Sequence, residues 1–111
     1  MTFKLLDFLN DCQDAFSLKN SNFKDIDLKV VRSASGDSLL HAAVTRGDIE
    51  LVKELCENGL NVNAQGDLGY TPLHCAADYK FTLIYKYLVS QGGSQDVLDN
   101  FGKTPADLFY G

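Results

Sequence analysis

The chain has 111 residues, of which 45% are hydrophobic, and its 15 acidic and 10 basic residues give a formal net charge of −5. This length and composition are typical of one soluble globular domain with its own core. An acidic surface repels phosphate backbones, which disfavours nucleic acid as a ligand, and no apolar run approaches the ~18 residues of a membrane-spanning helix. Asp7, Asn10 and Asp11 interrupt the apolar N-terminus where a signal peptide would need a continuous run, so a cytoplasmic location is expected.

Residues 1–32 are expected to cap the N-terminal end of the fold with helices. Apolar residues recur there at helical intervals, and Thr2 is a suitable N-cap. The apolar residues in this pattern are Phe3, Leu5, Leu6, Leu9, Cys12 and Phe16. Farther along, Ile26, Leu28 and Val30 are expected to cover the edge of the next unit.

The rest of the chain repeats itself with a period of 33 residues. His41 and His74 are equivalent at this spacing, and so are Pro72 and Pro105. The same spacing relates Gly36 to Gly69 and Gly102, Ser38 to Thr71 and Thr104, Leu40 to Leu73, and Ala43 to Ala76. Such a period indicates stacked units, each of which buries its apolar face against its neighbours.

The repeated motif resembles that of the ankyrin repeat. Residues 69–77, Gly-Tyr-Thr-Pro-Leu-His-Cys-Ala-Ala, match the family signature Gly-x-Thr-Pro-Leu-His-x-Ala-Ala at every specified position. The resemblance implies an all-α repeat solenoid of helix–turn–helix units joined by β-hairpin loops, with about three to three and a half units including caps. The predicted parts of this single domain are 1–32 for the N-terminal capping helices, 33–65 and 66–98 for two ankyrin repeats, and 99–111 for a partial C-terminal repeat.

Local signals support these helix boundaries. Thr71 can cap a helix that starts at Pro72, because proline fits the first helical position, and Ser38 occupies the same cap position one unit earlier. Gly47 ends the first helix of its unit, where a left-handed residue is favoured. Lys80 stands at that position in the next unit. Either the backbone there is left-handed at a cost of about 1 kcal/mol, or the turn is reshaped.

The sequence offers no set of catalytic or metal-binding residues. The resemblance implies that His41 and His74 each hydrogen-bond the backbone of the neighbouring loop. Cys12, Cys56 and Cys75 are odd in number and widely spaced, which predicts free thiols and neither a disulfide framework nor a zinc site. No phosphate-binding glycine loop is present either. We therefore predict a protein that is not an enzyme and uses no cofactor or metal.

The resemblance also implies a partner-binding site on the concave face, formed by the finger tips and the exposed side of the first helix of each unit. The matching positions are Ser35, Asp37, Thr45, Arg46, Asp67, Leu68, Tyr70, Asp78, Tyr79, Phe101 and Lys103. Exposed aromatic residues are frequent interface anchors, and the aspartates around them suit a partner with a basic patch. The alternative for Tyr70 and Phe101 is that they pack against neighbouring fingers.

The leading functional hypothesis is a module that binds another protein as an adaptor or inhibitor and is monomeric when free. One alternative is a bacterial immunity protein that neutralises a cognate toxin, because small, acidic, stand-alone ankyrin proteins resemble that class. A second alternative is a fragment of a larger ankyrin array. Met1 argues against this alternative, and the end at Gly111, soon after the third motif, keeps it open.

Overall fold

The computed structural model describes residues 1–18 and 22–111, and over these ranges it is an elongated stack of short helices. Its α-helices are α1 (Phe3–Asp11), α2 (Leu39–Thr45), α3 (Ile49–Glu57), α4 (Pro72–Asp78), α5 (Thr82–Ser90) and α6 (Pro105–Tyr110). Two 3₁₀ helices, η1 (Phe23–Asp25) and η2 (Asp67–Gly69), lie in the connections. The described residues contain no β-strand, which confirms the all-α class.

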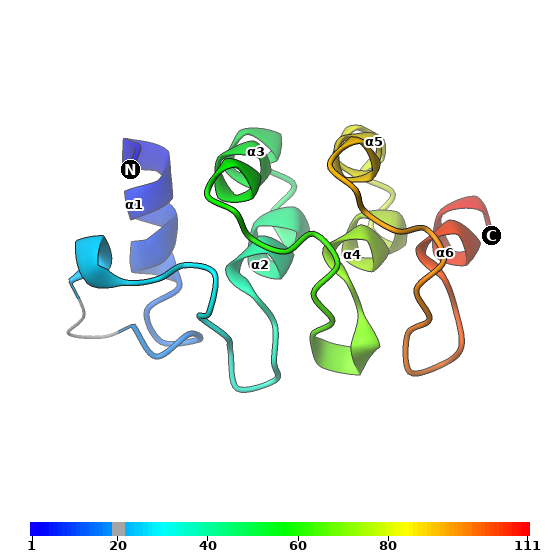
Figure 1. Ribbon diagram of the computed structural model, residues 1–111, viewed down its shortest axis with the longest axis horizontal. Helices are drawn as coiled ribbons and strands as arrows, with labels where there is room; N and C mark the ends of the chain where they lie inside the picture. The colour runs from blue at the N-terminus through cyan, green and yellow to red at the C-terminus, as the bar shows by residue number, and fades with distance from the viewer. Residues whose placement is uncertain (19–21) are drawn as a thin grey trace.

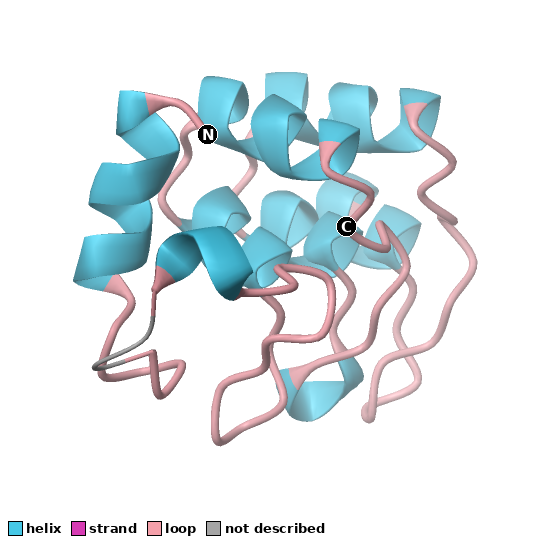
Figure 2. Cartoon of the chain, turned by 60° about the vertical axis from the view of Figure 1, so that its left-hand side comes forward, coloured by secondary structure: helices cyan, strands magenta, loops and turns pink. Residues whose placement is uncertain are grey.

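The helices form two layers that run along the long axis. The row α2, α4, α6 makes the inner layer, α3 and α5 lie above it, and α1 stands at the N-terminal end (Figure 1). Three long loops project from the other side of the inner layer, all in the same direction (Figure 2). We call these loops fingers 1, 2 and 3, and they span residues 33–37, 66–70 and 99–103. The arrangement confirms the predicted solenoid of helix–turn–helix units.

The inner helices begin where the repeated motif predicts. Ser38, Thr71 and Thr104 are their N-caps, and each side-chain oxygen accepts a hydrogen bond from the backbone N–H three residues later. Each cap also closes a capping box, in which the third helical residue accepts a bond from the backbone N–H of the cap. His41 and His74 play this part in α2 and α4, whereas Asp107 plays it in α6.

The two buried histidines join neighbouring units. Nδ1 of His41 accepts from the backbone N–H of Ser38 at 3.0 Å, so the ring proton lies on Nε2. Nε2 then donates to the carbonyl oxygen of Tyr70 in finger 2, at 2.7 Å. His74 repeats the arrangement one unit later and donates to the carbonyl oxygen of Lys103 at 3.0 Å. The predicted structural role of both histidines is therefore confirmed.

The fingers differ from the predicted β-hairpins. Each is closed by one backbone hydrogen bond of 2.7–2.8 Å, from the N–H of its first residue to the carbonyl oxygen of its last. The only bridge in the described part of the chain is an isolated antiparallel pair between Arg32 and Ser38. Neighbouring fingers are instead held by hydrogen bonds between loops, such as that from the N–H of Asn100 to the carbonyl oxygen of Leu68, at 2.9 Å.

The core runs unbroken through the described units. Its fully buried side chains come from the facing sides of both helix layers, and small residues such as Ala43 and Ala76 let the inner helices approach closely. The largest of these fully buried side chains are Phe8, Leu5, Leu9, Leu39, Leu40, Leu51, Leu55, Leu73 and Leu88. Within the described residues, no helix has the length and apolar character needed to cross a membrane.

The N-terminal segment departs from its prediction in two ways. In place of a pair of capping helices, its described residues form one α-helix, α1, and the short 3₁₀ helix η1, while residues 19–21 lie outside the described ranges. The expectation for Val30 was also wrong. Its side chain is 69% exposed, whereas Leu28 is buried and Ile26 partly buried. Only two of these three apolar residues face the next unit, because the chain turns away after Leu28.

Candidate functional site

A small hollow opens on the concave face between the first two fingers. It has a volume of about 130 Å³ and lies where finger 2 meets finger 1 and the ends of α2 and α4. Its lining residues are Asp37, Thr45, Asp67, Leu68, Tyr70, Cys75, Asp78 and Tyr79. We call it the acidic hollow. Of the predicted site residues that project from these elements, all but Ser35 and Arg46 line it.

The hollow is built by contacts between the two fingers. One carboxylate oxygen of Asp37 accepts a hydrogen bond from the backbone N–H of Asp67 at 2.8 Å. Gly66 makes this approach possible, because a Cβ atom there would lie 2.2 Å from that oxygen and 3.0 Å from the Cα of Asp37. The short separation fixes the position of finger 2 against finger 1. The wall of the hollow between the two fingers is therefore positioned by backbone contacts.

The two tyrosines of the hollow differ in how freely they meet solvent. Tyr70 is half-buried, and its ring stacks on that of His74 with 5.2 Å between centroids. Tyr79 is 56% exposed and stacks on Phe81 at 5.5 Å. Tyr70 therefore combines a packing role with a place in the hollow, and Tyr79 is the freer contact surface.

Two residues of the hollow occupy locally unfavourable positions. Leu68, at the tip of finger 2, has a left-handed backbone with φ of 60° and a side chain that is 46% exposed. A non-glycine residue in this conformation carries strain of about 1–2 kcal/mol. Asp78 is the last residue of α4, where a carboxylate opposes the helix dipole. Residues in such unfavourable conformations or positions are frequent at functional sites.

The carboxylates of the hollow have no basic partner among the described residues. The ion pairs among the described residues are Lys4 with Asp48, Lys4 with Glu50, and Arg46 with Asp11. Each of these pairs includes a residue of α1. Burial raises the pKa of the Tyr70 hydroxyl, and the negative charges of Asp78 and Asp99 raise it further. Burial together with Asp37 and Asp78 raises the pKa of the Cys75 thiol to about 12. The electrostatic potential in the hollow is therefore negative.

Arg46, a predicted site residue, does not line the hollow. Its guanidinium donates to Asp11 at 2.9 Å and lies 5.3 Å from the centre of the Phe8 ring in α1. These contacts turn a basic side chain away from the concave face and toward the N-terminal helix. The concave face is therefore more acidic than the sequence indicated.

Two further predicted residues, Phe101 and Lys103, belong to finger 3 and also lie outside the hollow. Phe101 is 68% exposed, so the alternative that it packs against a neighbouring finger is not what the structure shows. Lys103 contributes its backbone carbonyl to the bond with His74. Cys75 was missed by the sequence prediction, because only the stacking of the units turns that side of α4 toward finger 2.

A second hollow of about 240 Å³ lies beside the first along the concave face. It shares Asp37 and Thr45 with the acidic hollow, so the two are neighbours. Its other lining residues are small, apolar or neutral: Ala15, Phe16, Ser33, Ser35, His41 and Ala42. We call it the neutral hollow. Ser35, also predicted as a site residue, belongs here.

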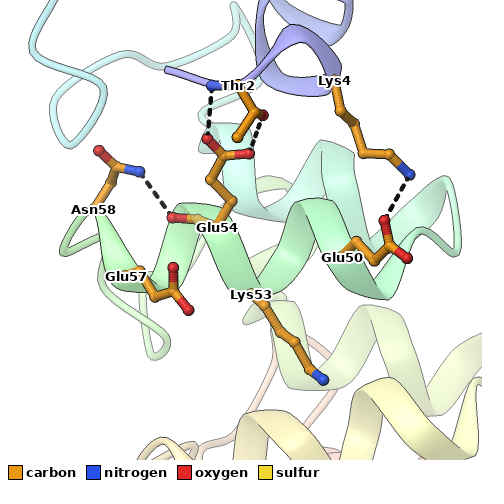
Figure 3. A pocket seen from close by; sticks show the side chains of 7 residues that line it. All are labelled: Thr2, Lys4, Glu50, Lys53, Glu54, Glu57 and Asn58. Carbon is orange, nitrogen blue, oxygen red and sulfur yellow. Dashed lines mark hydrogen bonds and ion pairs between the residues drawn. The ribbon is translucent and has the colours of Figure 1, made fainter.

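Another hollow, of about 450 Å³, lies elsewhere, between the N-terminus of α1 and the outer helix α3. Figure 3 shows that its polar groups bond to one another: both the backbone N–H and the hydroxyl of Thr2 reach Glu54, and Lys4 pairs with Glu50. These contacts attach α1 to the first repeat unit. We regard it as a structural joint, because Thr2, Lys4, Glu50 and Glu54 are already partnered across it.

The thiols do not supply a reactive nucleophile. Burial raises the pKa of all three thiols: that of Cys12 rises, and those of Cys56 and Cys75 reach about 11 and about 12. Protonated thiols are poor nucleophiles at neutral pH. Among the residues that the structure describes, no group of His, Cys, Asp and Glu is arranged to hold a metal ion.

Comparison with known proteins agrees with this architecture. The sequence model described as "Ankyrin repeats (3 copies)" matches residues 5–100. Protein phosphatase 1 regulatory subunit 27 of Homo sapiens is 38% identical over 74 residues, which cover 67% of this chain and 48% of that protein. An ankyrin and IPT/TIG repeat-containing protein of Schizosaccharomyces pombe is 43% identical over 74 residues, covering 67% of this chain and 6% of that protein.

Ankyrin repeat domain-containing protein 40 of Mus musculus is 34% identical over 70 residues, covering 62% of this chain and 19% of that protein. The matched region thus spans about half the length of the phosphatase regulatory subunit, at 48%, and less of the other two relatives. Ankyrin repeats mediate protein–protein interaction. The match over residues 5–100 and the repeated helix pairs show that the chain belongs to the ankyrin repeat family.

Proposed function

We propose that this protein binds a partner protein through its concave face, as an adaptor or inhibitor without catalytic activity of its own. The observation that carries the proposal is the acidic hollow, in which exposed apolar surface from Leu68 and Tyr79 adjoins three carboxylates without an ion-pair partner in the described residues. Aromatic anchors within a charged rim are typical of interface hot spots. The partner is a protein with a basic patch.

The local misfits at Leu68 and Asp78 support this assignment. Both residues lower the stability of the free protein, through backbone strain and through opposition to the helix dipole. Both line the same hollow. Contact with a partner would explain why both residues occupy these unfavourable positions, which the fold alone does not explain.

The proposal also covers the organisation of the chain. The units 33–65 and 66–98 supply the binding surface, 1–32 and the partial repeat 99–111 close the two ends, and the free protein is a cytoplasmic monomer. The hydrogen bonds from His41 to Tyr70 and from His74 to Lys103 hold these parts in register.

The test is partner capture from a native lysate with tagged protein. The concave variant Asp67→Lys/Asp78→Lys reverses two carboxylates of the hollow. The control variant Glu57→Lys/Asp96→Lys changes the net charge equally at exposed positions outside both concave hollows. We expect wild type and control to recover the same protein and the concave variant to lose it. Equal recovery by both variants would show that the concave face is not the binding surface.

The relatives suggest a specific probe for this experiment. The human relative is, by its name, a regulatory subunit of protein phosphatase 1. Purified protein phosphatase 1 is therefore tested directly beside the lysate, and selective binding would favour the regulatory role. Recovery of a toxin, encoded by a gene beside that of this protein, would favour the immunity alternative.

A further inference from the structure

The acidic hollow is the right size for one side chain of a partner. Its volume of about 130 Å³ is roughly four times the ~30 Å³ that a water molecule occupies in the liquid. Pockets for small molecules are usually larger, at about 300–1,000 Å³. The hollow is also open to the concave groove, which a partner's backbone would follow. A single protruding side chain therefore fits it better than a free ligand does.

The charge of the hollow selects a cation. Asp37, Asp67 and Asp78 line the hollow from finger 1, finger 2 and the end of α4. One oxygen of Asp37 accepts a hydrogen bond from the backbone N–H of Asp67. Among residues 1–18 and 22–111, no side chain donates a hydrogen bond to the carboxylate of Asp67 or Asp78. The nearest arginine on the first inner helix, Arg46, is held by Asp11 on the other side. Because no ion pair among the described residues involves these three aspartates, they are free to pair with a cation of the partner.

The residues that line the hollow favour arginine over lysine. A guanidinium is planar, presents five N–H donors to several carboxylates at once, and stacks on aromatic rings. Tyr79 offers a ring that is 56% exposed, and Leu68 offers apolar surface for the methylene stem. A lysine ammonium is a compact point charge, so it stacks less well on the tyrosine ring and bonds fewer carboxylates at once than a guanidinium does.

We infer that the partner inserts one arginine side chain into the acidic hollow, with its guanidinium against Asp67 and Asp78 and one face toward the ring of Tyr79. This inference rests on the proposed function, and it names the chemistry by which the same surface recognises its partner.

The test is an NMR titration of the full ¹⁵N-labelled chain with the tripeptide acetyl-Gly-Arg-Gly-amide. The control peptide carries citrulline, which has nearly the shape of arginine but no charge. We expect the arginine peptide to shift the amide signals of Asp67, Leu68 and Tyr79, with an apparent dissociation constant at least about tenfold lower than that of the citrulline peptide.

Matched variants locate the binding. Asp67→Asn/Asp78→Asn keeps side-chain size and is expected to abolish the shifts, while Glu57→Gln/Asp96→Asn, with the same change in net charge, is expected to keep them. Wild-type circular dichroism in both variants establishes that they are folded. Equal shifts with both peptides, equal effects of both variants, or shifts spread over the acidic surface would each overturn the inference.

The outcome is separable from that of the proposed function. If capture of the partner depends on the concave face but the arginine peptide does not discriminate, the binding surface stands and the arginine inference fails. If capture is independent of the concave face, the proposed function fails whatever the peptide does.

Discussion

At the residue scale, the fold depends on two histidines that each serve two elements. Nδ1 of His41 completes the cap of its own helix, and Nε2 holds the next finger through Tyr70. The side chain is only 1% exposed, so both of its partners would be left in a poorly solvated place without it. Leaving a buried donor or acceptor unpaired costs about 1–3 kcal/mol.

Replacement of His41 by alanine is therefore expected to lower the free energy of unfolding by about 2–4 kcal/mol, because it leaves the N–H of Ser38 unpaired and removes one of the two hydrogen bonds that the carbonyl of Tyr70 accepts. Urea unfolding followed by circular dichroism measures this. The surface control Glu57→Ala is expected to change stability by less than about 0.5 kcal/mol. A His41→Ala protein as stable as this control would disprove the role given to the histidine.

The same residue gives the protein a dependence on pH. Burial lowers the pKa of His41 below its ordinary 6.5, although the bond to the Tyr70 carbonyl and the charge of Asp37 act in the opposite direction. The unfolded chain therefore takes up a proton near pH 6.5 that the folded protein does not, and stability falls as the pH drops below that value.

We expect the free energy of unfolding to be nearly constant between pH 7 and 8 and to decline from about pH 6.5 toward pH 5, by at most about 1.4 kcal/mol per pH unit for this one group. Unfolding curves collected across this range measure the slope. His41→Gln should lose part of it. A wild-type slope of zero or of opposite sign would contradict a neutral His41 in the fold.

At the scale of elements, close contact between fingers decides where the site residues lie. Gly66 has an ordinary negative φ of −113°, so any cost of a side chain there comes from contact with Asp37 and not from the backbone. Gly36 is the reverse case, since its φ is +94° but nothing lies within 4 Å of an added Cβ atom. Substitutions at these two glycines therefore distinguish the cost of steric contact from the cost of backbone strain.

Gly66→Ala is expected to cost about 1–3 kcal/mol by forcing finger 2 away from finger 1, and Gly36→Ala about 1 kcal/mol. Thermal or urea unfolding compares the two. Only Gly66→Ala should also move the NMR signals of the acidic hollow. Unchanged signals there would mean that the finger contact does not shape the hollow.

Lys80 shows how one element supports the next. Its backbone is left-handed, with φ of 58°, as expected if the turn keeps the form it has at Gly47. Its side chain also reaches α6, where Nζ donates to the carbonyl oxygens of Leu108 and, at 2.9 Å, Phe109. A cation at the C-terminal end of a helix pairs with its free carbonyls and its dipole.

Lys80→Met keeps the stem and removes the charge, so we expect α6 to fray and overall stability to drop by about 0.5–1 kcal/mol. Hydrogen exchange should become faster at the amides of α6 and remain unchanged in α2. Lys86→Met, at an exposed position on α5, serves as the control. The prediction fails if both variants exchange alike.

At the scale of the whole molecule, structural features that recur in each unit can be predicted from the sequence, whereas features that occur once cannot. The 33-residue period marks the starts of α2, α4 and α6, and the equivalent positions of His41 and His74 predict their role. These features depend on short-range signals that occur more than once. The absence of β-strands from the described fingers was missed, because their backbone hydrogen bonds lie within tight turns and between neighbouring loops.

The N-terminal segment lacks the repeat and was the least predictable part. Phe8 is 2% exposed, which its helical spacing from Leu5 and Cys12 is consistent with, but its place under the guanidinium of Arg46 does not follow from that spacing. The partner of Arg46 is Asp11, which is 35 residues away in the sequence and outside the repeat. The residues of the acidic hollow come from the repeated units, whereas Arg46 is turned away by its contacts with α1.

The most direct test of the account is the affinity of the captured partner for Tyr79→Ala compared with Leu83→Ala. Both wild-type side chains are large and exposed, at 56% and 74%, but Tyr79 lies in the acidic hollow and Leu83 on the outer helix α5. Calorimetry should show Tyr79→Ala weakening binding by about 2 kcal/mol, close to thirtyfold, with Leu83→Ala within about twofold of wild type. Equal affinities for the two variants, or a larger loss for Leu83→Ala, would contradict a partner-binding concave face.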